Sequence, residues 1–277
     1  MPHPDPRDDD QLISLATAGD RAAFEVLALR HAPAVLRLAR AMTTSETAAE
    51  DVVQETFVAA FRASATYRAG VSSVRTWLFA IARNEARRTY RNRHEVLAGE
   101  EPDEAPLLTL GLAAGWGHEP AEEALARAEH TERLARAVAS LAPDDREVLV
   151  LRDLEGLSGE QASAVLGLAL PAMKSRLHRA RLRLLAALRE SEGSVVANER
   201  DVSGITCTGV LARLGDYVDG DLESAEVALV DGHLRGCTVC ERFGGRYGRM
   251  VRDARERLGS PPSVDEAQLE RIRALLR

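Results

Sequence analysis

The stretch from Gly156 to Arg183 constrains the fold of this chain most, because it has the pattern of two short helices joined by a tight turn. Ser158 followed three residues later by Gln161 is a capping box, which marks a helix start. Gly167 is a natural stop for that helix, and Pro171 is placed to begin the next one. The sequence therefore predicts a helix-turn-helix.

The second of these helices separates apolar from basic side chains. Between Ala172 and Arg189 there are six Lys or Arg and no Asp or Glu, in a chain whose net charge is −7. A basic helix face is often only solvated surface, but this contrast favours DNA binding. Outward side chains would meet base edges, and flanking cations would meet phosphates. The apolar stripe is Met173, Leu177, Ala180 and Leu184; Ser175, His178 and Arg179 point away from it; Lys174, Arg176, Arg181 and Arg183 flank it.

Composition indicates an all-α protein of two or three small domains. The 277 residues are rich in Ala, Leu and Arg, and aromatic residues make up only 4%. Because the sequence shows neither a long apolar run nor a secretory signal, we expect no membrane association and a cytoplasmic location. The polar first ten residues are expected to be disordered.

A second basic helix is predicted at residues 73–93, with six Arg and one acid, Glu85. The loop from Tyr67 to Ser73 precedes it and contains small residues and a glycine, which allow close approach to a ligand. Aromatic rings beside arginines suit single-stranded nucleic acid, where stacking and phosphate neutralisation dominate. Trp77 is also well placed simply to be part of the core.

The net negative charge is concentrated in one segment. From Glu95 to Glu129 there are nine acids and one base, so the rest of the chain is close to neutral. Proline and glycine accompany the acids, which predicts a linker whose first half has no fixed structure.

Three cysteines occur, all in the last quarter of the chain. His233, Cys237 and Cys240 have the spacing H-x-x-x-C-x-x-C, and Cys207 would complete a tetrahedral set of three thiolates and one imidazole. A filled set favours a structural or regulatory zinc ion over a catalytic one. The alternative is three unrelated cysteines in a helical domain.

Three sequence words, in this order, resemble those of extracytoplasmic-function (ECF) sigma factors of bacterial RNA polymerase, and the resemblance runs from about Asp20 to Leu188. AEDVVQETFVAAFR resembles the helix that grips the polymerase clamp, SVRTWLFAIARNEARR the element that opens the −10 region, and LSGEQASAVLGLALPAMKSRLHRARLRL the reader of the −35 element. Residues 205–251, with the word YVDGDL, resemble the zinc-binding anti-sigma fold.

The resemblance implies two helical sigma domains joined by an acidic linker, followed by a small helical zinc-binding domain. The expected boundaries are 11–94, 95–128 (linker), 129–190, 191–203 (linker) and 204–277. The partners implied are core RNA polymerase, promoter DNA at its −10 and −35 elements, and an intramolecular contact between sigma and zinc domains. The residues implied are Asp51, Gln54 and Glu55 for polymerase; Tyr67, Arg83, Asn84 and Arg87 for the −10 strand; and Lys174, Ser175, Arg176, His178 and Arg179 for the −35 duplex.

The predicted function is that of a sigma factor without catalytic residues, directing promoter-specific initiation and modulated in cis by its zinc domain. Two roles of that domain stay open: masking the sigma surfaces until thiol oxidation or zinc loss releases them, or acting as a structural or activating appendage. The alternative function is a stand-alone helix-turn-helix regulator with a structural zinc module. A zinc enzyme is disfavoured because four protein ligands would fill the metal's coordination shell.

Overall fold

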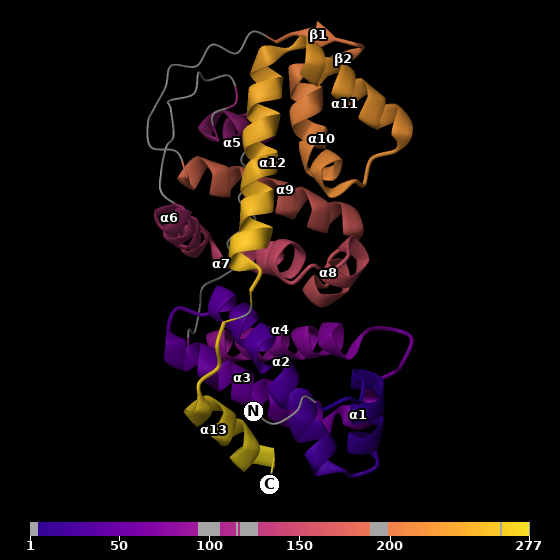
Figure 1. Cartoon of the computed structure of the whole chain (residues 1–277), viewed down its shortest axis with the longest axis vertical. Helices are drawn as coiled ribbons and strands as arrows, with labels where there is room; N and C mark the ends of the chain where they lie inside the picture. Colours follow the sequence, from indigo (N-terminus) through magenta and orange to yellow (C-terminus); the bar gives the residue numbers. More distant parts are fainter. Residues whose placement is uncertain are drawn as a thin grey trace. The chain divides into compact units, whose positions relative to one another are not determined.

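The computed structural model describes residues 5–93, 106–114, 116, 127–188, 199–260 and 262–276, and these are almost entirely helical (Figure 1). The predicted all-α fold is confirmed, with one short two-stranded ribbon in addition. The chain divides into two compact units that do not follow the domain boundaries expected from the sequence. The first comprises Met1–Ala98, Val150–Ala169 and Pro261–Arg277, and the second Gly99–Leu149 and Leu170–Ser260.

The first unit is built around three helices, α2, α3 and α4, that pack against one another. Its core contains the large side chains Phe24, Phe57, Leu78 and Phe79, all essentially inaccessible to solvent. Helix α8 packs on α4, and α13 packs on α2 and α3. The elements are α1 (Asp9–Thr17), α2 (Arg21–Met42), α3 (Glu46–Arg62), the 3-10 turn η1 (Ser64–Thr66), α4 (Val74–Arg93), the π-helical turn η2 (Val150–Leu154), α8 (Gly159–Leu166) and α13 (Glu266–Leu276).

Helix ends in this unit follow local sequence signals. Ser158 and Gln161 form the predicted capping box at the start of α8, with the Gln161 backbone N–H donating to Ser158 Oγ at 3.2 Å. Gly167 ends that helix in the left-handed conformation with φ of 63°, which glycine adopts without strain. Ser45 caps the start of α3, where its hydroxyl oxygen accepts a hydrogen bond from the Ala48 N–H.

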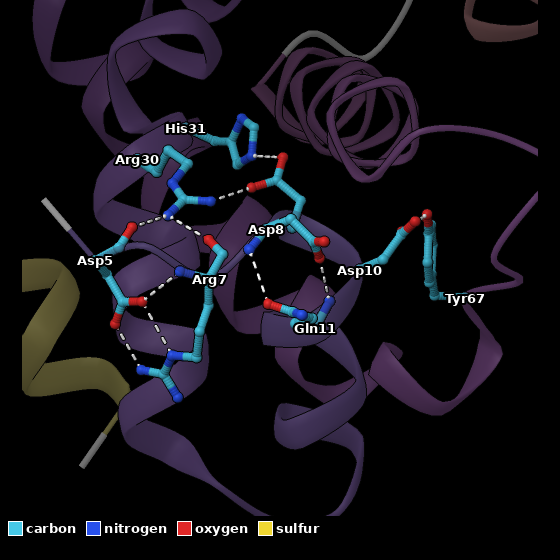
Figure 2. A network of polar contacts seen from close by, with 9 residues as sticks. Asp5, Arg7, Asp8, Asp10, Gln11, Arg30, His31 and Tyr67 are labelled. Atoms are coloured by element: carbon cyan, nitrogen blue, oxygen red, sulfur yellow. Dashed lines mark hydrogen bonds and ion pairs between the residues drawn. The ribbon is translucent and has the colours of Figure 1, made fainter.

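Residues 5–10 are held by polar contacts rather than disordered, which corrects the expectation for this segment. Asp9, at the start of α1, is paired with Arg30 and His31 of α2, each 2.7 Å from one of its carboxylate oxygens. Figure 2 shows the side chains of Arg30 and His31. The hydrogen bond from His31 and the charge of Arg30 hold the pKa of Asp9 at about 2. The Arg30 guanidinium also donates to the backbone oxygens of Asp5 and Arg7.

A buried carboxylate joins the segment after η2 to the helices of the first unit. Glu155 lies 3.0 Å from the Arg37 guanidinium of α2 and is also paired with Arg75 of α4. Burial lowers the pKa of Arg37, and the charge of Glu155 opposes that effect. Because removing one partner of a buried pair typically costs about 3–5 kcal/mol, Glu155 explains why this segment groups with α2 and α4.

The second unit is arranged around α9, which contacts α5, α7, α10 and α12. Two residues each from β1 and β2 pair antiparallel, with Asp201 opposite Thr206 and Val202 opposite Ile205. The elements are α5 (Leu107–Ala113), α6 (Arg127–Ser140), α7 (Pro143–Leu149), α9 (Leu170–Ala187), β1 (Asp201–Val202), β2 (Ile205–Thr206), α10 (Cys207–Asp219), α11 (Ser224–Gly236) and α12 (Thr238–Leu258).

The predicted acidic linker contains helix α5, so residues 107–113 have fixed structure, contrary to the expectation for part of its first half. Leu110 and Ala114 are buried against other helices of the second unit. Apolar burial thus overrides the weak helical signal of a segment flanked by proline and glycine. Residues 94–105, on which most of that expectation rests, lie outside the described residues.

Candidate nucleic-acid interface and metal site

Helix α9 has the predicted apolar stripe. Met173, Leu177, Ala180 and Leu184 are all buried, which confirms the core face read from the sequence. Leu182 and Leu185, outside that stripe, are buried as well. A helix covered on more than one side is not a freely solvated DNA-reading helix, so the partners of its polar side chains matter.

One flank of α9 is paired with acids at the end of α10 and just after it. The Lys174 ammonium lies 2.8 Å from Asp221 and 3.3 Å from Asp216. Arg181 is completely buried and binds both carboxylate oxygens of Asp219, at 2.8 and 3.0 Å. Three carboxylates of the cysteine-containing segment therefore form ion pairs with Lys174 and Arg181, the two cations that were expected to contact the DNA backbone.

The other flank is paired with acids of α7, the helix that precedes the helix-turn-helix segment. Arg183 contacts both oxygens of Asp145 in α7, at 2.8 and 3.0 Å, and Arg176 lies 3.4 Å from Asp144. Burial raises the pKa of Asp145, although the charge of Arg183 counteracts this. These pairs do not involve the cysteine-containing segment.

His178 is buried, whereas the helical wheel places it on the outward, exposed face. The Tyr247 hydroxyl of α12 lies 3.0 Å from its Nδ1, and Gly215 of α10 approaches the ring so closely that a Cβ there would be 3.1 Å from Nδ1. Burial and the charge of Arg181 lower the pKa of His178 to about 4. The wheel correctly directs His178 away from the apolar stripe, but α10 and α12 cover that side. Ser175 is exposed and Arg179 half-buried.

The four residues expected to contact the −10 strand have different environments. The Tyr67 hydroxyl donates to Asp10 at 2.8 Å (Figure 2), and its ring makes an edge contact with half-buried Trp77. Burial and Asp10 raise the pKa of Tyr67 to about 12. Arg83 is buried, while Asn84 and Arg87 are exposed one helical turn apart on α4.

The residues expected to contact polymerase lie along α3. Asp51 and Glu55 are exposed, and Glu55 lies 3.3 Å from Arg88. Gln54 is half-buried because it lines a pocket closed by α13. The pocket also includes Leu36, Val53 and Ile272, and its edge carries the ion pair of Glu50 with Arg271 at 2.8 Å.

The four predicted metal ligands come together in the second unit. The candidate ligand atoms of Cys207, His233, Cys237 and Cys240 all lie within 4.8 Å of one another, and all four residues are buried. The Sγ atoms of Cys207 and Cys237 are 3.9 Å apart. Tetrahedral zinc with Zn–S bonds of about 2.3 Å would place two sulfurs about 3.8 Å apart, so the spacing fits.

Local structure prepares these side chains for a metal. His233 Nδ1 is 2.8 Å from the Ile205 carbonyl, so that nitrogen carries the proton and Nε2 faces the thiols. Nε2 is buried and has no hydrogen-bond partner among the described residues, as expected for a metal ligand. Burial raises the pKa of Cys237, but the Cys240 N–H, Cys207 and His233 outweigh it and lower the pKa to about 7.

Comparison with known proteins identifies the same three parts. Residues 27–95 match the family model for sigma-70 region 2, residues 131–184 that for sigma-70 region 4, and residues 207–240 a putative zinc finger. The chain is 38% identical to RNA polymerase sigma factor CnrH of Cupriavidus metallidurans, over 66% of this chain and 96% of that protein. It is 32% identical to the ECF sigma-E factor of Salmonella typhimurium, over 62% and 90% respectively. The solved structure of CnrH in complex with the cytosolic domain of CnrY is 33% identical, covers 65% of this chain and 96% of that one, and has a TM-score of 0.46.

The chain therefore belongs to the RNA polymerase sigma factors, DNA-binding proteins that direct transcription initiation. Within them it is an ECF sigma factor that carries a C-terminal domain of the putative zinc-finger type. Among the described residues, no helix is both long and apolar enough to span a membrane. Asp216, Asp219 and Asp221 were not among the predicted site residues; their only signal was the YVDGDL word, which includes two of them.

Proposed function

We propose that this ECF sigma factor is held inactive in cis by its zinc-binding module, which covers the −35-reading helix α9. The observation that carries the proposal is the pairing of Lys174 and Arg181 with the acids of α10 and the loop after it. Carboxylates there stand in for the phosphates that lysine and arginine would neutralise on DNA. The burial of His178 against α12 supports the same interpretation, because a side chain covered by protein cannot contact a base edge.

The remaining site assignments follow from the family. Core polymerase would bind along α3 at Asp51, Gln54 and Glu55. The −10 strand would meet Tyr67, Arg83, Asn84 and Arg87, and the −35 duplex would meet α9 at Lys174, Ser175, Arg176, His178 and Arg179. One zinc ion would be held by Cys207, His233, Cys237 and Cys240, supplying structural rigidity to the module; this chain supplies no catalytic group.

The C-terminal helix α13 is also inhibitory, because it covers part of the proposed polymerase-binding surface on α3. Helix α13 places Ile272 over Leu36 and Val53, beside Gln54, and pairs Arg271 with Glu50 and Arg273 with Glu25. A polymerase helix binding along α3 at Gln54 would compete for that apolar surface. The contact of the zinc module with α9 and that of α13 with α3 both favour a form of the protein that is not bound to a promoter.

The test is promoter-dependent run-off transcription with core polymerase and a double variant, Asp216→Asn with Asp221→Asn. These changes remove both anionic partners of Lys174 while keeping side-chain size. We expect run-off activity and duplex affinity to rise about 3- to 10-fold, with the gain greatest at low salt because the competition is electrostatic.

The matched control is Glu226→Gln, which makes the same change in the same module at the exposed pair with Arg213. Its activity should equal that of the unmodified chain. A double variant that stays folded and zinc-loaded yet shows no gain would contradict the masking. Failure of the chain to associate with core polymerase in any form would instead contradict its assignment to initiation.

A further inference from the structure

The linker helix α5 is seated on the helices that carry the candidate −35 interface and the first metal ligand. It contacts α9 and α10, with Leu110 and Ala114 buried. At Gly111 the approach is so close that a Cβ would lie 2.6 Å from the Leu211 side chain of α10. A side chain at this position would require Leu211 to move, so glycine favours the close seat of α5 on α10.

Trp116 continues this contact to the metal-ligand cluster. Its backbone N–H donates to the Gly111 carbonyl at 2.8 Å, which ends α5 and turns the side chain inward. The side chain is 3% exposed, and its indole N–H hydrogen-bonds to the sulfur of Cys240. The linker between the two DNA-contacting domains therefore touches a candidate metal ligand directly.

This contact depends on whether the metal is bound. In small cysteine and histidine modules metal binding and folding are coupled, so a bound metal fixes the position of Cys240 and loss of the metal frees its ligand residues. Metal ligands are commonly oriented by such outer partners, whose loss weakens metal binding about 10- to 100-fold.

We propose that Trp116 couples metal occupancy of the cysteine cluster to the position of the linker. With metal bound, the fixed position of Cys240 holds Trp116 and keeps α5 seated on α9 and α10. Loss of the metal weakens that hold and releases the linker from both helices. The coupling is reciprocal, since detaching α5 must weaken metal retention by the same factor. The inference rests on the proposed zinc site and adds a route by which that site acts on the sigma domains.

The experiment uses the full chain with Trp77→Phe, which leaves Trp116 as the single tryptophan of the two in the sequence. Zinc-loaded protein is compared with protein treated with a zinc chelator. We expect the Trp116 emission to shift to longer wavelength on zinc removal, and amide exchange in residues 107–116 to accelerate at least about 10-fold. The rate of zinc transfer to the chelator, followed with a colorimetric indicator, measures the reverse effect, that of detaching α5 on metal retention.

Two substitutions separate the hydrogen bond from simple packing. Trp116→Phe keeps a ring but removes the N–H, and should accelerate zinc transfer about 10-fold. Gly111→Val places a side chain against Leu211 and should release α5 and accelerate zinc transfer without altering any thiol. Leu108→Ala, at an exposed position of α5, should change neither the seat of α5 nor the rate of zinc transfer.

The outcomes distinguish this coupling from the zinc site itself. If one zinc per chain is bound and removed while Trp116 emission and exchange in residues 107–116 stay constant, the coupling is wrong and the site stands. Unaltered zinc transfer in both Trp116→Phe and Gly111→Val would overturn it equally. A full chain that retains no zinc at all would overturn the site and the coupling together.

Discussion

At the scale of single residues, His178 reports on whether α9 is covered. Its imidazole faces Tyr247 of α12, Arg179 and Arg181 of α9, and Asp219 of α10, and burial lowers its pKa from 6.5 to about 4. Between those two values the unfolded chain binds a proton that the folded chain does not. The free energy of unfolding therefore rises with pH across this window. The contribution of neutral His178 is fully present above about pH 6.5 and is lost as the pH falls toward 4.

We expect the second unit to lose up to about 3 kcal/mol of stability between pH 7 and pH 4 from this residue, at about 1.4 kcal/mol per pH unit. Urea unfolding followed by circular dichroism at several pH values measures it. His178→Gln keeps a polar side chain that cannot titrate, so its stability should vary less over this range. Equal pH dependence in the two proteins would show that His178 titrates normally and is not buried.

The placement of His178 illustrates what the sequence could predict at this scale. Helical periodicity correctly separates Met173 and Leu177 from His178, because it describes the core to which one helix contributes. It cannot tell which other segment covers the opposite face. The metal ligands were easier, since the spacing of His233, Cys237 and Cys240 requires no knowledge of packing.

At the scale of elements, α13 tests whether polymerase access to α3 is restricted. Ile272 is buried in the pocket against Leu36 and Val53. Ile272→Asp would place a charge in this apolar pocket. Because burying an unpaired charge is costly and α13 is a short helix, α13 should detach. We expect the affinity for core polymerase to rise about 10-fold or more, measured by fluorescence anisotropy of the labelled chain.

Ala274→Asp is the matched control, because it adds the same charge to an exposed position of the same helix. Its affinity should be that of the unmodified chain. The interpretation of α13 as a competitor would be abandoned if Ile272→Asp frees the helix, as judged by amide exchange in residues 266–276, without any gain in polymerase affinity.

The elements differ in how far the sequence could predict them. The capping box at Ser158 and the stop at Gly167 are local, and the structure has both where they were expected. The apolar residues of α13 recur at helical spacing, but no local signal indicates that the helix docks on α2 and α3. The seat of α5 depends on Gly111 meeting Leu211, a contact across about 100 residues of sequence that periodicity cannot show.

At the scale of the whole molecule, charge explains why an acidic chain can carry basic reading helices. The linker holds the net negative charge, and the zinc module adds carboxylates that pair with α9 itself. An isolated chain should therefore bind duplex DNA weakly, because its α9 cations are already neutralised. Since α9 and α13 belong to different compact units, relief of the two contacts should contribute independently to activity.

The last prediction follows from removing the module entirely. A chain that ends at residue 201 lacks α10 to α13, so both the acids that pair with α9 and the helix that covers Gln54 are gone. We expect run-off transcription to rise about 10-fold or more over the full chain, on a promoter located by mapping transcript 5′ ends in cells that produce the short form. Adding Lys174→Ala and Arg181→Ala to the short chain should abolish that gain, because the uncovered cations are then missing. A short chain that is helical by circular dichroism yet no more active than the full chain would mean that the zinc module does not inhibit.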